Sequence, residues 1–248
     1  MSLPKTLISL AIAGSALALS TAALADAIVV RSTGPSAATY PVGRRIAPAE
    51  RVVLRAGDRV VLVGEGATRT LSGPGDFPVR APQQARQNRS ATLDRWISTT
   101  GGGISRTGAV RGSGDGPAAA PNLWVVNIEQ GGNFCVTDMA NVTLWRADMS
   151  QDALLTVQDV ATPASTSPLA FVTGQNFRAW PTATMPISEG KTYRISGSGM
   201  AAPIEVRFTA LASAPTGAEA TAAALAEKGC TGQLAQLGNR LEEIAGGR

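Results

Sequence analysis

The clearest alternation of apolar and polar side chains lies between residues 123 and 211. At Ile204, Val206 and Phe208 every second residue is apolar, which places the three side chains on one face of a β-strand. Seven or eight short segments of this kind follow one another, with turn signals about every eight to twelve residues. This pattern is typical of an antiparallel β-sandwich, so we expect an Ig-like sandwich over residues 122–211.

Two turns within the sandwich can be assigned from composition. Gly131 and Gly132 separate apolar segments at 123–128 and 134–136, which predicts a hairpin with glycine at the positions of positive φ. The Pro- and Ser-rich stretch at 161–168 predicts a loop, followed by a strand at 169–172. Phe177 begins a further strand that must stop or lie at a sheet edge, because Pro181 follows it.

A second, smaller β-rich module is expected over residues 26–80. β-branched runs at 51–54 and 59–63 flank Gly57 and Asp58, and glycine beside aspartate favours a hairpin turn. A glycine-rich turn at 64–66 leads to another strand at 67–71. Four or five strands in about 50 residues predict a small barrel or a curled sheet.

Residues 81–121 have the composition of a basic, flexible linker, rich in Gln, Ser and Gly. Its arginines after residue 80 are Arg86, Arg89, Arg95, Arg106 and Arg111. Leu93, Trp96 and Ile97 have the i, i+3, i+4 spacing of one helix face, which predicts a short helix that docks on a neighbouring domain or on a partner. The glycine-rich run at 101–108 lacks the Gly-Lys-Ser/Thr that a phosphate-binding loop requires.

Residues 212–248 predict helix. An Ala-rich stretch is followed by apolar residues at intervals of four and three, which form one stripe: Cys230, Leu234, Leu237, Leu241 and Ile244. We expect this amphipathic helix to lie on the sandwich.

The first 25 residues predict a cleavable signal peptide. Lys5 precedes an apolar stretch at 7–19, and Ala23 and Ala25 supply the small residues that a signal peptidase requires, with cleavage before Asp26. The apolar stretch is shorter than the roughly 20 residues of a membrane span, although a retained anchor is the alternative. We therefore expect a periplasmic or secreted protein with no transmembrane anchor after cleavage.

The cysteine and histidine content limits which disulfides, catalytic sites and metal sites the chain can contain. The chain has two cysteines, Cys135 and Cys230, which in an exported protein predict one disulfide, with two buried free thiols as the alternative. It has no histidine, which excludes Ser-His-Asp, Cys-His and His-ligated zinc sites. The net charge of +4 is mild and gives no reason to expect nucleic acid as a partner.

The residues Leu54 to Asp58, Val61 to Val63 and Thr70 to Gly75 resemble the core of FecR-like periplasmic β modules, which carry a similar rhythm of leucine, Gly-Asp and glycine. The resemblance covers about 30 residues, and its motif consists of turn chemistry. The overall layout also resembles uncharacterised exported proteins of alphaproteobacteria. The resemblance implies a β module in the cell envelope and a regulatory or sensing role.

We expect a non-enzymatic binding or assembly protein that needs no cofactor and no metal. Its partner would be another envelope protein or an anionic envelope polymer, bound through an exposed strand edge or through the basic linker. Arg95, Trp96, Arg106 and Arg111 are the candidate interaction residues of the linker. The tryptophans could instead form a sugar-binding platform.

The alternative function is a hydrolase that acts on envelope polysaccharide through two carboxylates. Such an enzyme needs a cleft with two facing acids, one of which has a raised pKa. The candidate acids are Asp138, Asp148, Asp152, Asp159, Glu189 and Glu205.

Overall fold

The computed structural model describes residues 26–80, 91–98 and 120–246. These residues form mainly β-structure with a C-terminal helical segment, which confirms the predicted fold class. The N-terminal strands are β1 (Ala27–Thr33), β2 (Arg45–Ile46), β3 (Arg51–Leu54), β4 (Arg59–Gly64), β5 (Ala67–Ser72) and β6 (Gly75–Pro78). They form a four-stranded sheet of order β2-β1-β4-β5 and a two-stranded sheet of β3 with β6.

The two N-terminal sheets share one apolar core, to which Val29, Ile46 and Val52 contribute. Glu65 and Gly66 both have positive φ and connect β4 to β5, so the turn predicted there is confirmed, and it joins two strands that pair with each other.

The hairpin predicted at Gly57 is wrong. Gly57 has the positive φ of a turn, but β3 pairs with β6, whereas β4 pairs with β1 and β5. The turn carries the chain from one sheet to the other. It is held by the carboxylate of Asp58, which accepts hydrogen bonds from the N–H groups of Ser36 and Arg55.

The C-terminal strands form two further sheets. Their bounds are β7 (Val126–Asn127), β8 (Gly132–Val136), β9 (Thr143–Trp145), β10 (Ala153–Asp159), β11 (Thr166–Phe171), β12 (Phe177–Ala179), β13 (Thr192–Gly197) and β14 (Ile204–Ala210). The five-stranded sheet has the order β11-β10-β13-β14-β8, and the three-stranded sheet has the order β12-β9-β7. The two sheets share one core, in which the rings of Tyr193 and Phe208 pack edge-on against Trp180 at 5.2 and 5.1 Å. This arrangement is compatible with an Ig-like sandwich.

Three details of the predicted sandwich need correction. β7 and β8 belong to different sheets, so Gly131 and Gly132 do not close a hairpin. β8 runs parallel to β14, and β7 runs parallel to β9, so the pairing is not wholly antiparallel. β11 begins at Thr166, within the stretch expected to be a loop.

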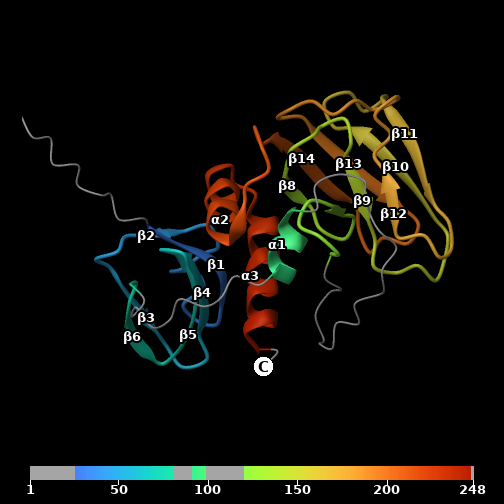
Figure 1. Cartoon of the computed structure of the whole chain (residues 1–248). Helices are drawn as coiled ribbons and strands as arrows, with labels where there is room; N and C mark the ends of the chain where they lie inside the picture. The colour runs from blue at the N-terminus through green and yellow to red at the C-terminus, as the bar shows by residue number, and fades with distance from the viewer. Residues whose placement is uncertain (1–25, 81–90, 99–119, 247–248) are drawn as a thin grey trace, which may run out of the picture.

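Three helices form a layer between the two β modules (Figure 1): α1 (Ala91–Ser98), α2 (Gly217–Glu227) and α3 (Thr231–Gly246). The predicted helix face of Leu93, Trp96 and Ile97 is buried in a core shared with α2 and α3. The C-terminal helix was expected on the sandwich alone, whereas α3 contacts both β1 and β8. The helical layer therefore joins the modules through a common core.

On the face that contacts the N-terminal module, α3 approaches β1 very closely at Gly238. A Cβ atom added to Gly238 would lie 2.5 Å from the carbonyl oxygen of Val30. One turn later, Glu242 forms ion pairs with Arg31 at 2.8 Å and with Arg59 at 2.5 Å. These contacts fix α3 on the four-stranded sheet.

Among the described residues, no helix combines the length and apolar character needed to span a membrane.

Candidate functional site

The two edges of the five-stranded sheet differ, and this difference defines the candidate site. At the β8 edge, the amide of Gln233 accepts a hydrogen bond from the N–H of Cys135 (2.6 Å) and donates to its carbonyl (3.0 Å). The same amide donates to the carbonyl of Leu123 (3.0 Å), and Gln233 is only 1% exposed. A side chain of α3 thus takes the place of a neighbouring strand at Cys135.

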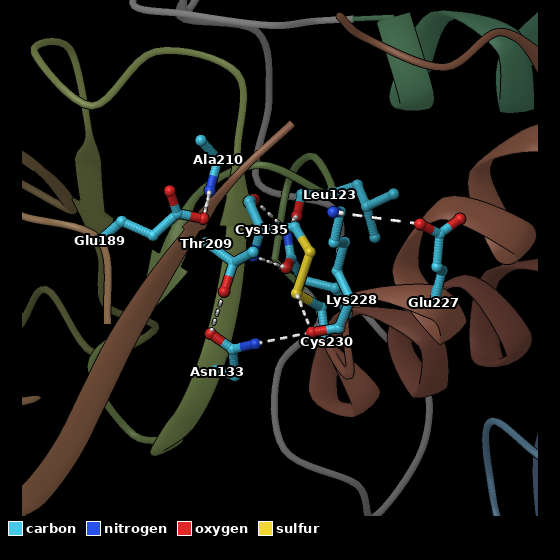
Figure 2. The surroundings of a disulfide bond; sticks show 10 residues. Leu123, Asn133, Cys135, Glu189, Thr209, Ala210, Glu227, Lys228 and Cys230 are labelled. Carbon is cyan, nitrogen blue, oxygen red and sulfur yellow. Dashed lines mark hydrogen bonds and ion pairs between the residues drawn. A yellow bond between two sulfur atoms is a disulfide. The ribbon is translucent and has the colours of Figure 1, made fainter. Parts of the chain in front are cut away.

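The predicted disulfide is present beside this contact and links Cys135 of β8 to Cys230, the residue before α3 (Figure 2). Figure 2 also shows Asn133, whose amide accepts a hydrogen bond from the Thr209 hydroxyl and donates to the Lys228 carbonyl. Covalent and hydrogen bonds therefore close the β8 edge.

The opposite edge strand, β11, pairs with β10 alone among the described strands. Ala170 and Pro168 of β11 lie opposite Leu154 and Thr156 of β10. The carbonyl of Leu154 accepts a hydrogen bond from the N–H of Ser198, the residue directly after β13, so it points away from β11. Because antiparallel partners alternate between bonded and non-bonded pairs, the backbone groups of Pro168 and Ala170 point to the open side.

Apolar side chains lie along the outer face beside this edge. Leu154 is 64% exposed and Val172 is 57% exposed, and both are large hydrophobic residues. Ala170 lies opposite Leu154 and two residues before Val172, and Pro168 follows on the same face opposite Thr156; both are exposed. The open edge is therefore flanked on its outer side by an apolar stripe.

On the inner side, an open groove of ≈ 360 Å³ separates β11 from β12. Leu169, Phe177, Trp180 and Pro181 supply apolar lining, and Arg178 contributes a guanidinium. β12 is itself the terminal strand of its sheet, because it pairs with β9 alone among the described strands. Two terminal strands of different sheets thus form the walls of the groove.

The sequence around the groove carries almost no charge. Between Asp159 and Glu189, Arg178 is the one charged residue. Natural proteins usually protect an open edge with charged residues, especially lysine, with proline or with a covering segment. Within the described part of the chain, the protection at β11 is limited to Pro168, which removes one N–H donor.

Comparisons with protein-family models, with curated proteins and with solved structures find no match for this chain. Its function therefore has to follow from its own geometry.

The candidate interaction residues of the linker do not form a described site. Arg106 and Arg111 lie outside the described residues, and so does the side chain of Arg95, although its backbone belongs to α1. Trp96 is buried and donates a hydrogen bond from its indole N–H to the carbonyl of Ala120 at 3.3 Å. Its role in the structure is to fix α1 to the helical layer.

The sugar-binding platform is not formed, because all four tryptophans are buried: Trp96, Trp124, Trp145 and Trp180. Besides that of Trp96, two more indole N–H groups donate hydrogen bonds within the fold. Trp124 donates to the carbonyl of Ile97, and Trp180 donates to that of Met185.

The six carboxylates proposed for a hydrolase hold turns and ion pairs. Glu205 pairs with Arg194 at 2.7 Å, and Glu189 accepts a hydrogen bond from the N–H of Ala210 at 3.3 Å. Hydrogen bonds to the carboxylate lower the pKa in the other four: Asp138, Asp148, Asp152 and Asp159. Their main side-chain donors, in the same order, are Asn141, Ser150, Thr173 and Lys191. A general acid needs a raised pKa, which is the opposite shift.

No three of the metal-binding residue types lie close together within the part of the chain that the structure describes. A small cavity in the N-terminal module, lined in part by Ala27, Leu62 and Val79, measures ≈ 10 Å³. It has room for about one water molecule and not for an organic ligand.

Proposed function

We propose that this chain is an exported, non-enzymatic binding protein that captures an extended polypeptide segment as an additional strand beside β11. The observation that carries the proposal is the contrast between the two edges of one sheet: β8 is closed by Gln233 and a disulfide, whereas β11 pairs with β10 alone among the described strands. Added strands form main-chain hydrogen bonds with such an edge, while pockets beside it select side chains. The partner would be another protein of the cell envelope.

The proposed location is the periplasm or the exterior, reached through the signal peptide of residues 1–25. The disulfide between Cys135 and Cys230 supports an oxidising compartment. The N-terminal module resembles FecR-like modules, so its share of the proposed function is regulatory: it would report or transmit occupancy of the sandwich. The helical layer supports such coupling, because α3 contacts both β1 and β8.

Site-specific photo-crosslinking can test the proposed edge. A photoreactive amino acid would replace Val172, beside the β11 edge, or Val53, on β3 of the N-terminal module. The two positions form a matched pair, because Val172 is 57% exposed and Val53 is 58% exposed. In the producing cell, we expect a discrete adduct from position 172 and none from position 53.

The variant Ala170→Pro tests whether the backbone of β11 makes the contact. It removes an N–H that points to the open side, as Pro168 already does two residues earlier, so the β10–β11 ladder keeps its hydrogen bonds. Ala170→Val, which retains the N–H, is the control. We expect the position-172 adduct to disappear in Ala170→Pro and to persist in Ala170→Val, with the circular dichroism spectra of both unchanged. Equal adducts from positions 172 and 53, or an adduct that survives Ala170→Pro, would contradict the proposal.

A further inference from the structure

We infer that the captured segment is apolar on its outer face and carries, on its inner face, an aspartate or glutamate side chain that pairs with Arg178. This inference rests on the proposed function, since it specifies the occupant of the same edge. It follows from the side chains that lie on the two sides of the β11 edge and from the charge of Arg178 in the groove.

On the outer face, a strand added to β11 would place every second side chain beside the apolar stripe. Those side chains would meet Ala170 and Val172 directly and lie near Leu154 on the next strand. Cross-strand neighbours on one face lie about 4.5–5.5 Å apart, so apolar side chains of the segment would cover this stripe. Apolar surface buried there would be removed from water, which favours apolar over polar residues at these positions.

On the inner face, the alternate side chains would enter the groove between β11 and β12. Leu169 and Trp180 lie at its base but are only 4% and 2% exposed, so they offer almost no surface to a ligand. Half-buried Phe177 and the exposed Arg178 are the side chains that a ligand would meet. The groove therefore presents polar as well as apolar surface, and Arg178 is the one charged side chain among the described residues that line it.

The charge of the segment follows from Arg178. Other arginines of the sandwich have partners within it: Arg194 pairs with Glu205, and Arg146 donates to three backbone carbonyls. Arg178 is exposed on the wall of the groove and takes part in none of the ion pairs formed among the described residues. No carboxylate lies between Asp159 and Glu189 in the sequence, so the nearest stretch of chain offers it no counter-ion.

A set of capped peptides tests both parts of the inference by fluorescence anisotropy. The first is a fluorescein-labelled nonapeptide of alternating valine and alanine with aspartate at its centre, made soluble by a polyethylene glycol tag. The second and third have asparagine or lysine at the centre, and the fourth has serine in place of every valine. Each is titrated with the full mature chain and with the variants Arg178→Ala, Arg178→Glu and Ala170→Pro.

We expect the aspartate peptide to bind the wild-type chain about 1.4-fold to fivefold more tightly than the asparagine peptide, which is the range for an exposed ion pair. The preference should vanish in Arg178→Ala and in 0.5 M salt (roughly a 4 Å Debye length), and Arg178→Glu should prefer the lysine peptide. The fourth peptide, with serine in place of valine, should bind at least tenfold more weakly than the valine-containing peptides, because it lacks their apolar side chains.

The outcomes separate the inference from the proposed function. Equal binding of the aspartate, asparagine and lysine peptides, lost in Ala170→Pro, would overturn the assigned chemistry and leave edge capture standing. Equal binding of the serine and valine peptides would overturn the apolar assignment in the same way. If no peptide binds, or if all bind Ala170→Pro as well as wild type, edge capture itself is overturned. If the adduct from position 172 contains only two copies of this chain, the occupant of the β11 edge would be a second copy of the chain and not a segment of another protein.

Discussion

The side-chain amide of Gln233 forms two hydrogen bonds with the backbone of Cys135, one as acceptor and one as donor. Cys135 is also the residue that the disulfide joins to Cys230, three positions before Gln233. The start of α3 therefore holds a single residue of β8 in two independent ways. The contact closes one sheet edge and attaches the helical layer to the sandwich.

Gln233→Leu should destabilise the protein by about 3 kcal/mol. The substitution keeps an apolar side chain of similar size but leaves the N–H and carbonyl of Cys135 and the carbonyl of Leu123 buried without partners, and each such group costs about 1–3 kcal/mol before relaxation. Urea unfolding followed by circular dichroism measures the change. The control is Gln236→Leu on the same helix, whose amide bonds to the side chain of Gln130 and to no backbone group. It should lose less than about 1 kcal/mol, and equal losses in the two variants would argue against a special role for Gln233.

Gly238→Ala should destabilise the protein, although alanine usually stabilises a helix interior by up to about 1 kcal/mol relative to glycine. The added Cβ would lie 2.5 Å from the carbonyl oxygen of Val30, so α3 must move away from β1. We expect a net loss of about 1–3 kcal/mol, as for overpacked cores. Gly232→Ala, on the same helix, is the control because a Cβ there meets no atom within 4 Å. Thermal unfolding should show a lower midpoint for Gly238→Ala only, and equal shifts of both midpoints would contradict the close contact.

Local patterns in the sequence predicted those helices, strands and turns that are determined by residues close together in the chain. The alternation at Ile204, Val206 and Phe208 identified β14, and the spacing of Leu93 and Trp96 identified α1. Glycine–aspartate chemistry at Gly57 also predicted a turn correctly. It could not predict which strands pair, because a turn fixes the local change of direction while pairing depends on burial against strands distant in the sequence.

The candidate site shows the same limit. A period of two distinguishes exposed Leu154 from buried Leu155, but it does not say that β11 is an edge strand. Pro168 and the uncharged run around it were signals for an edge that the sequence contained, since proline in a strand is confined to edges and bulges. Gln233 gave no signal, because a polar residue on an amphipathic helix is expected to face water.

Replacing both cysteines, in Cys135→Ala with Cys230→Ala, should lower the free energy of unfolding by about 2–5 kcal/mol. The disulfide closes a loop with a sequence separation of 95 residues, and the chain-entropy model gives about 4–5 kcal/mol for such a loop. Urea unfolding without reductant measures the loss, and dithiothreitol should have no further effect on the double variant. In the wild type both cysteines are fully buried, so dithiothreitol should act slowly until urea opens the fold. Unchanged stability of the double variant would show that the covalent link adds nothing to the contacts of Gln233.

The stability of the N-terminal module should fall in acid through Asp58. Burial opposes ionisation of this carboxyl group, but hydrogen bonds from Ser36 and from the N–H of Arg55 outweigh it, so its pKa lies below the ordinary value of 3.8. A group whose pKa is lower in the folded than in the unfolded state stabilises the fold above its unfolded value, and this contribution is lost as the pH falls through the folded value. Asp58→Asn should therefore be less stable than the wild type at pH 7, and the difference should shrink steadily below about pH 4. Urea unfolding at pH values between 7 and 2.5 measures it, with the exposed Glu227→Gln as the control expected to follow the wild type. A difference that stays constant over this range would mean that the Asp58 side chain holds the turn by shape and not by its charge.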